Sequence, residues 1–135
     1  MFKSKRSAEP AREPTSRQIT GDGGEARALA YLQRQGLRLV ERNYRVARGR
    51  SRRAGEIDLI LRDADGTLVF VEVRSRLGVE AGGAAASVTA AKRARLVYAA
   101  QHYLLRFDRL PPCRFDVVAI DGAELQWLPA AFDAG

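Results

Sequence analysis

The sequence predicts a mixed α/β domain, with a sheet flanked by helices. Three observations favour this class. Apolar residues recur with helical spacing in two segments, whereas five other segments alternate or run apolar in the manner of strands. These segments follow one another in the order α-β-β-β-α-β-β, which is typical of a sheet with helices packed on it. A length of 135 residues suits one domain with its own core, which we place at residues 20–135.

The net charge of +7 comes almost entirely from arginine. Arginine presents a planar fork of donors that suits phosphate oxygens, so a polyanionic partner such as nucleic acid is expected. A basic proteome or selection for solubility would give the same charge without such a partner. Residues 1–19 are rich in Ser, Pro, Lys and Arg, which predicts a flexible basic tail. The tail either touches nucleic acid or is merely a solvated end.

Several classes of site are excluded by residues that are scarce. The chain has one cysteine, Cys113, and one histidine, His102, so it holds neither an internal disulfide framework nor a Cys/His zinc cluster. A Ser-His-Asp triad would have to recruit His102. A divalent cation held by oxygen ligands is the metal chemistry that stays open. No apolar run is long enough to cross a bilayer and no signal-peptide core follows Met1, so we expect a cytoplasmic protein without a membrane partner.

A first helix is expected over about residues 24–35, with Asp22 as its cap and Gly36 as its stop. Glu25 lies four residues before Leu29, so it projects from the inward-facing stripe of this helix. A carboxylate near a helix N-terminus also interacts favourably with the helix dipole, and that alone can account for an acid at this position.

Five strands are expected, over about residues 37–47, 56–62, 67–74, 114–120 and 125–128. The second and third form a hairpin around the turn Asp65-Gly66. An arginine-rich loop or hairpin follows the first strand and presents positive charge. We expect nucleic-acid contacts from Arg45, Arg48, Arg50, Arg52 and Arg53 in this segment, and from Arg76 and Arg93 beyond it.

A second helix is expected from a cap at Thr89 to about Phe107. Lys92 lies four residues before Leu96, so it projects from the buried stripe. It also lies near the helix N-terminus, where the dipole opposes a cation. Lys92 therefore needs an anionic partner, which is either an acid of the sheet or a substrate phosphate.

Two acids interrupt the apolar pattern of the predicted hairpin. Asp58 lies in Gly-Glu-Ile-Asp-Leu-Ile, and Glu72 lies in Val-Phe-Val-Glu-Val-Arg. If the strands pair normally the two carboxylates lie near each other, and about 4 Å apart they repel by about 4 kcal/mol at an effective dielectric near 20. A divalent ion, Mg²⁺ or Mn²⁺, would reverse that repulsion and activate water for attack on phosphate. The alternative is a structural network in which both acids pair with arginines.

The same segments resemble those of a known family. The runs that carry the resemblance are Gly24-Glu25-Ala26, Gly55-Glu56-Ile57-Asp58-Leu59-Ile60, Phe70-Val71-Glu72-Val73-Arg74, Lys92 and Arg114-Phe115-Asp116-Val117-Val118. In this order they look like the YraN-like family of small bacterial proteins, over about residues 20–133. That family in turn resembles the restriction-endonuclease-like nucleases with the PD-(D/E)xK signature, which include Holliday-junction resolvases.

The resemblance implies a restriction-endonuclease-like fold and a metal site. Glu25, Asp58 and Glu72 would hold Mg²⁺ or Mn²⁺, and Val73 would offer a backbone carbonyl. Arg74 stands where the signature has lysine. Arginine stays charged at any usable pH, so it can stabilise negative charge but cannot act as a base. Lys92 would then take over part of the lysine's role.

We therefore expect a metal-dependent endonuclease that hydrolyses phosphodiester bonds of DNA, including branched intermediates. The alternative is a weak or inactive nucleic-acid-binding module, or a partner in a DNA-processing complex, which the arginine at position 74 favours. A resolvase-like role would want a two-fold homodimer to address both strands.

Overall fold

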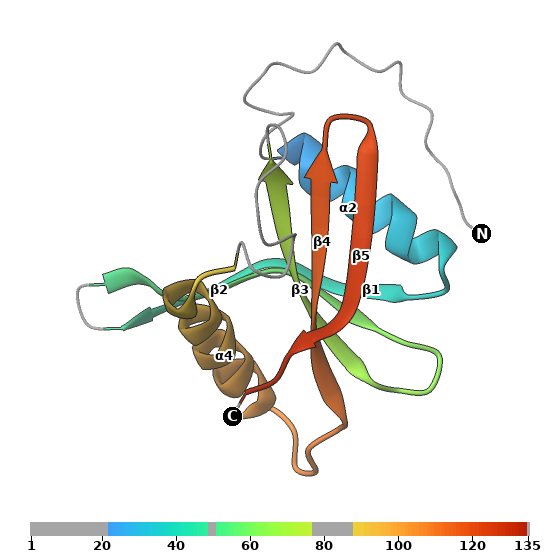
Figure 1. Ribbon diagram of the computed structural model, residues 1–135. Coiled ribbons are helices and arrows are strands. Elements are labelled where there is room, and N and C mark those ends of the chain that lie inside the picture. Colours follow the sequence, from blue (N-terminus) through green and yellow to red (C-terminus); the bar gives the residue numbers. More distant parts are fainter. Residues whose placement is uncertain (1–21, 49–50, 77–87, 135) are drawn as a thin grey trace.

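The computed structural model describes residues 22–48, 51–76 and 88–134 (Figure 1). In this part of the chain the elements are α2 (Asp22–Arg34), β1 (Arg38–Arg48), β2 (Ser51–Arg62), β3 (Leu68–Arg76), α4 (Ala90–Leu104), β4 (Cys113–Asp121) and β5 (Glu124–Phe132). The predicted mixed α/β class, with two helices and five strands, is confirmed for these residues. The predicted tail at residues 1–19 lies outside them. No helix among them is long and apolar enough to span a bilayer.

The five strands form one mixed sheet in the order β1-β2-β3-β4-β5. β3 and β4 run parallel, and the other neighbouring strands are antiparallel. The parallel pair is possible because α4 provides the crossover between β3 and β4. The hairpin that joins β2 to β3 turns at Gly66, whose φ of 93° suits glycine.

Each face of β3 contributes to a different core cluster. Leu68 and Phe70 pack with α4, whereas Val69 and Val71 pack with α2. Alternation along β3 therefore places Glu72 on the face that α4 covers, because Glu72 follows Phe70 by two residues. α4 is thus positioned to bring a side chain to Glu72.

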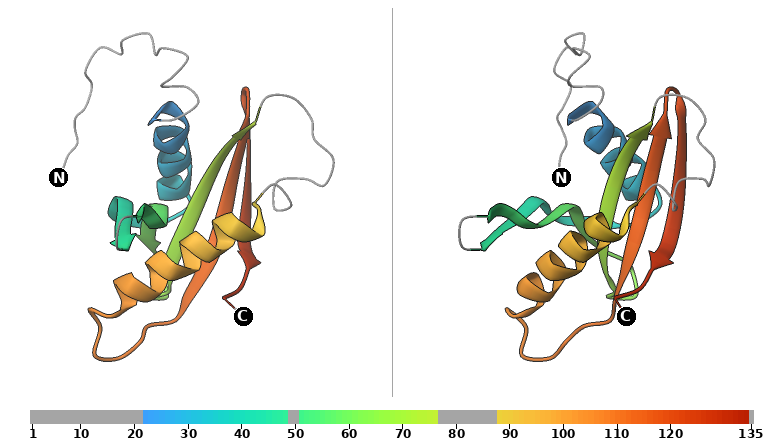
Figure 2. Two further views of the ribbon diagram at one scale, coloured as in Figure 1. Left: turned by 90° about the vertical axis from the view of Figure 1, so that its left-hand side faces the viewer. Right: turned by 60° about the vertical axis from the view of Figure 1, so that its left-hand side comes forward.

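β1 and β2 bend sharply where Asn43 lies across from Asp58. Asn43 has a φ of 53°, a left-handed conformation that asparagine tolerates better than most residues. Strict alternation along β2 would place Ile57 on the same face as Leu59, but Ile57 packs with Ile60 in the cluster under α4. The bend changes the alternation of β2, and the ends of β1 and β2 project beyond the rest of the sheet (Figure 2).

Three element bounds differ by three residues or more from those predicted, and α2 begins at Asp22 itself, which was expected to be its cap. β2 begins at Ser51 rather than near residue 56, so the arginine-rich segment forms the hairpin that was one of the two expectations, and Arg52 and Arg53 lie in its second strand. α4 ends at Leu104 rather than near Phe107. β5 extends to Phe132 because Asp116 of β4, which is 1% exposed, accepts hydrogen bonds from the Trp127 indole at 2.9 Å and from the Ala130 backbone N–H at 2.9 Å. These bonds fasten the far end of β5 to β4.

α4 begins at the predicted cap and lies unusually close to β2. The Thr89 hydroxyl accepts a hydrogen bond from the Lys92 backbone N–H at 3.2 Å. A Cβ added to Gly55 of β2 would lie 2.9 Å from the Ala99 nitrogen and 2.9 Å from the Tyr98 ring. Because α4 carries Lys92, this close approach sets how near the helix stands to the acidic end of β2.

Replacing Gly55 by alanine should therefore destabilise the protein by about 1–3 kcal/mol, since backbone and ring atoms must move to admit the methyl group. Urea unfolding measures this change. Gly66→Ala is the comparison variant: its Cβ meets nothing within 4 Å, so its cost of roughly 1 kcal/mol arises from φ alone. A Gly55→Ala protein as stable as wild type would show that α4 does not depend on this contact.

Candidate metal and phosphate site

The candidate site opens where β2 leaves β3. Pairing between these strands ends at Leu59 and Val71. Continuing the register would place Ile57 opposite Val73, but the Val73 N–H instead donates to the Asp58 carboxylate at 2.8 Å. In a strand the N–H and C=O of one residue point to the same edge. The Val73 carbonyl therefore also faces the gap, as its predicted role at a metal requires.

Glu72 lies on the other side of this gap and is only 6% exposed. The Lys92 ammonium donates to its carboxylate at 3.1 Å, and the Arg74 guanidinium lies 3.8 Å from the same oxygen. Lys92, which needed an anionic partner, thus finds it in an acid of the sheet. Burying an unpaired carboxylate is costly, and these two cations compensate the charge of Glu72.

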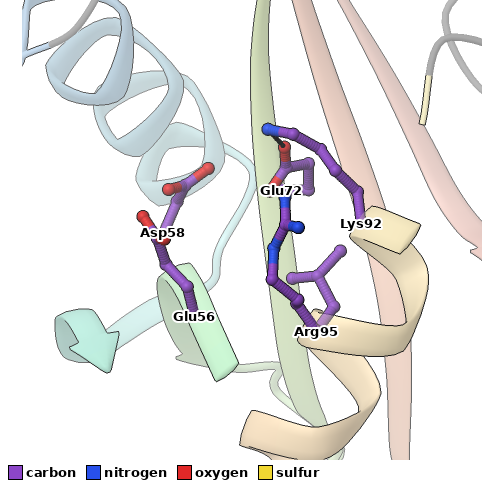
Figure 3. Close-up of a pocket in the computed structure, with 6 residues that line it drawn as sticks. Glu56, Asp58, Glu72, Lys92 and Arg95 are labelled. Carbon is purple, nitrogen blue, oxygen red and sulfur yellow. Dashed lines mark hydrogen bonds and ion pairs between the residues drawn. The ribbon is translucent and has the colours of Figure 1, made fainter. Parts of the chain in front are cut away.

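One cavity of about 40 Å³ brings the acids of both strands together. It is lined by Glu56, Asp58, Glu72, Lys92, Arg95 and Leu96. Figure 3 draws Glu56 and Asp58 on its β2 side, and Lys92 reaching from α4 to Glu72. A cavity of this size admits water.

Three of these lining residues, Glu56, Arg95 and the apolar Leu96, were not among the predicted site residues. Arg95 follows Lys92 by three positions, a helical spacing that places both side chains on one side of α4. Glu56 alternates with Asp58 on β2, which was the available signal for it.

Glu25 lies beside this cavity rather than in its lining. Its side chain is 15% exposed, and the Arg42 guanidinium lies 3.9 Å away. In the amide orientation that satisfies both groups, the Asn43 nitrogen donates to both Glu25 oxygens at 3.2 Å. Glu25 is therefore inward-facing, as predicted, and held by β1. Among the described residues no three Asp, Glu, His or Cys side chains form a ready-made metal cage.

Asp58 is the acid whose charge the described protein does not compensate. No Lys, Arg or His within the described ranges lies at ion-pair distance from it, and the Val73 N–H is its hydrogen-bond donor. Burial, followed by the negative charges of Glu72 and Glu25, raises the pKa of Asp58 to about 8, although the Val73 N–H acts in the opposite direction. The structural alternative, in which both acids pair with arginines, thus holds for Glu72 alone.

The predicted nucleic-acid contacts are spread over both sides of α4. Arg45 is exposed and pairs loosely with Glu56 at 3.9 Å, and Arg48 lies 5.7 Å from the centre of the Tyr98 ring. Arg93 donates to the Val88 carbonyl at 3.3 Å. The backbones of Arg52 and Arg53 lie in β2 and that of Arg76 in β3, while Arg50 lies outside the described residues.

Comparison with known proteins gives one family. A family model described as "Uncharacterised protein family UPF0102" matches residues 24–120, a span that contains Glu25, Asp58, Glu72 and Lys92. A "UPF0102 protein" of Methylibium petroleiphilum is 68% identical over 114 residues, which cover 84% of this chain and 93% of the relative. UPF0102 proteins of Paracidovorax citrulli and Cupriavidus metallidurans are 62% and 60% identical, each over 93% of this chain and 90% of the relative.

The raised pKa of Asp58 predicts how stability depends on pH. The folded protein holds a proton on Asp58 up to about pH 8, whereas the unfolded chain releases it near 3.8. Stability from this group is therefore full below about pH 3.8 and is lost as pH rises toward 8. Asp58→Asn keeps an acceptor for the Val73 N–H but cannot become charged. The free energy of unfolding of Asp58→Asn, measured in urea relative to that of wild type, should therefore rise by more than about 1 kcal/mol as pH increases across this interval.

Asp108→Asn is the control for this measurement, because Asp108 is exposed in the turn after α4. Its stability relative to wild type should not change across the same interval. If Asp58→Asn and Asp108→Asn behave alike, the carboxylate of Asp58 is not held in an environment that disfavours its charge.

Proposed function

We propose that this chain, which belongs to the UPF0102 family of uncharacterised proteins, is a divalent-metal-dependent phosphodiesterase that cuts DNA. Membership of that family confirms the YraN-like resemblance of the sequence. The nuclease likeness and the restriction-endonuclease-like identity of the sheet are part of the proposal. A DNA substrate would place the protein in the cytoplasm.

The observation that carries the proposal is the unequal compensation of two neighbouring acids. Glu72 has Lys92 and Arg74, whereas Asp58 on the facing strand has a backbone N–H and no cation at ion-pair distance within the described residues. A structural pair that stays ionised would place a cation on each acid, whereas Asp58 avoids an uncompensated buried charge only by holding a proton up to about pH 8. A site that is completed by a cation from solution leaves one acid in this state.

The residues present fit a hard divalent cation such as Mg²⁺ or Mn²⁺. Asp58 and Glu72 supply carboxylate oxygens on one cavity, the Val73 carbonyl faces the same gap, and Glu25 is close enough to raise the pKa of Asp58. Oxygen ligands of this kind are those that Mg²⁺ and Mn²⁺ prefer. When bound, such an ion lowers the pKa of water and offsets charge on a phosphate.

Basic side chains around the cavity suit a phosphodiester. The Nε of Arg74 is buried and has no acceptor among the described residues, and a phosphate oxygen would provide one. Lys92 and Arg95 approach from α4. As water attacks the phosphorus in line with the leaving oxygen, Arg74 and Lys92 would stabilise the charge that grows on the phosphate oxygens. Asp58 and Glu72 would hold the divalent cation at the phosphate.

A second candidate function is nucleic-acid binding without turnover. Arg74 stands where the nuclease signature that the sequence resembles has a lysine, and arginine, which stays protonated, cannot accept a proton from water. The ion pair between Lys92 and Glu72, at 3.1 Å, would then be permanent and would close the site to metal. In this case the exposed arginines carry the function, and the acidic cavity is a structural remnant.

Cleavage of linear, flapped and four-way DNA in Mn²⁺ tests the enzymatic proposal. Asp58→Asn should lower the rate at least about 100-fold, because losing a metal ligand removes several kcal/mol of transition-state stabilisation. Asp108→Asn is the matched control and should cleave like wild type. Equal trace activity in wild type and Asp58→Asn would assign the cleavage to a contaminant and remove the enzymatic proposal.

DNA binding in the presence of a chelator separates the two candidates. A binding module should hold the same DNA equally well with Mn²⁺ and with chelator, whereas the proposed enzyme should bind more tightly when Mn²⁺ is present. In either case, log affinity should fall linearly with log salt, by about 0.9 per phosphate contact on a duplex. Affinity that does not depend on salt would exclude phosphate contacts by the arginines.

A further inference from the structure

A groove lies on the side of α4 that points away from the acidic cavity. Lys92 and Arg95 reach the cavity, whereas Ala94, Val97 and Gln101 line the groove, about half a turn around the helix. The groove encloses about 410 Å³, a volume typical of sites for small organic groups. Small side chains form part of its lining, and Arg93, Gln101 and Asp133 add polar groups.

Tyr98 forms one side of the groove, and an arginine side chain lies over its ring. The Arg48 guanidinium from β1 lies 5.7 Å from the ring centre, in cation–π range. Tyr98 is fixed on its other side, because its ring approaches within 2.9 Å of the Cβ position of Gly55. A firmly held aromatic ring that an exposed arginine covers is a surface on which another planar group can stack once the arginine moves.

We propose that this groove binds an unpaired nucleotide of the nucleic-acid partner, with its base stacked on Tyr98. The proposal rests on the proposed function only in taking the partner to be nucleic acid, and it adds that part of the partner is single-stranded. Gln101 and Asp133 offer an amide and a carboxylate to the edge of a base. Arg48 and Arg93 offer guanidinium groups to the flanking phosphates.

The aromatic, polar and charged side chains that line the groove favour an unpaired nucleotide over other ligands. An acyl chain would offer no hydrogen bond to Gln101 or Asp133 and no charge to Arg93. A base paired in a duplex could reach Tyr98 only after extrusion, which costs a few kcal/mol that an unpaired base does not. An unpaired nucleotide uses the aromatic ring, the polar edge groups and the arginines together. Stacking of this kind is worth about 1–3 kcal/mol per base and tolerates any sequence.

The groove and the acidic cavity share one helix, and this connects the inference to the substrate. A helix with its side chains is about 10–12 Å across, so a strand that crosses α4 joins the two sites within a few nucleotides. Substrates with an unpaired stretch next to a phosphodiester, such as flaps and branched junctions, would engage both sites. A blunt duplex would engage the cavity side alone.

Binding of a short oligothymidylate and of a blunt duplex, both in chelator, tests the groove without any cleavage. Tyr98→Leu should weaken binding of the oligothymidylate about 5- to 150-fold, the loss expected for one stacked base, and should change duplex binding less than about twofold. Tyr98→Phe keeps the ring and should bind both ligands like wild type. A 2-aminopurine in the single strand should be quenched by wild type and not by Tyr98→Leu.

Surface variants keep the test valid if Tyr98→Leu fails to fold. Arg93→Gln and Arg109→Gln each remove one charge, but only Arg93 lines the groove, whereas Arg109 is exposed beyond α4. Arg93→Gln should therefore weaken oligothymidylate binding several-fold more than Arg109→Gln. The proposal that the groove binds an unpaired nucleotide would be wrong if these two variants had equal effects. It would also be wrong if Tyr98→Leu lost single-strand and duplex binding equally.

These outcomes are separate from those that test the proposed enzyme. If oligothymidylate binding needs Tyr98 but no DNA is cleaved, the nucleotide-binding groove is supported and the phosphodiesterase proposal is wrong. If Asp58-dependent cleavage is found while Tyr98→Leu binds oligothymidylate like wild type, the phosphodiesterase proposal is supported and the nucleotide-binding groove is wrong.

Discussion

The hydrogen bond from the Val73 N–H to the Asp58 carboxylate is the interaction on which the candidate site depends. It forms where the ladder between β2 and β3 stops, and it satisfies a backbone donor that the next strand pair would otherwise have used. In doing so it fixes a carboxylate in the gap between the strands. Without that gap, Glu72 would pack under α4 as an ordinary buried acid, and no cavity would connect the two strands.

The gap in turn follows from the bend across from Asp58. Asn43 takes up a left-handed backbone conformation there, and its amide, in the orientation that satisfies both groups, donates to Glu25 of α2. Asn43 thus lies where the β1–β2 ribbon turns away from the sheet, between two register shifts in that strand pair, and it also contacts a third acid beside the site. The close approach of α4 to Gly55 completes the arrangement from the other side, because it brings Lys92 within 3.1 Å of Glu72. Local backbone geometry therefore determines where each charge lies.

Much of this site could be predicted from the pattern of the sequence. Helical spacing placed Glu25 and Lys92 on inward-facing stripes, and alternation along the third strand placed Glu72 on the face that α4 covers. These signals depend only on the spacing of residues within one helix or strand, so they can be recognised without knowledge of the fold. Arg95 and Glu56 carried the same kind of signal, and their places beside Lys92 and Asp58 only gained meaning once the cavity was seen.

The remaining features depend on contacts between distant residues. Strict alternation would place Ile57 on the wrong face, because the alternation of β2 changes at the bend near Asn43 of β1, and the residues of β2 carry no signal of this change. β5 was predicted too short because its end is fastened by Asp116, which lies on another strand. The unequal compensation of Asp58 and Glu72 was equally hidden, since it requires knowing which cations reach which acid. Spacing alone left both a metal site and an arginine network open.

Diffraction from crystals soaked in Mn²⁺ tests most directly whether Asp58 and Glu72 form one cation site. We expect an anomalous peak in the cavity, about 2.0–2.2 Å from a carboxylate oxygen of each residue, with the Lys92 ammonium displaced from Glu72. If the cavity shows no peak at millimolar Mn²⁺, with Lys92 still bound to Glu72, then the two acids are structural and the phosphodiesterase account is wrong.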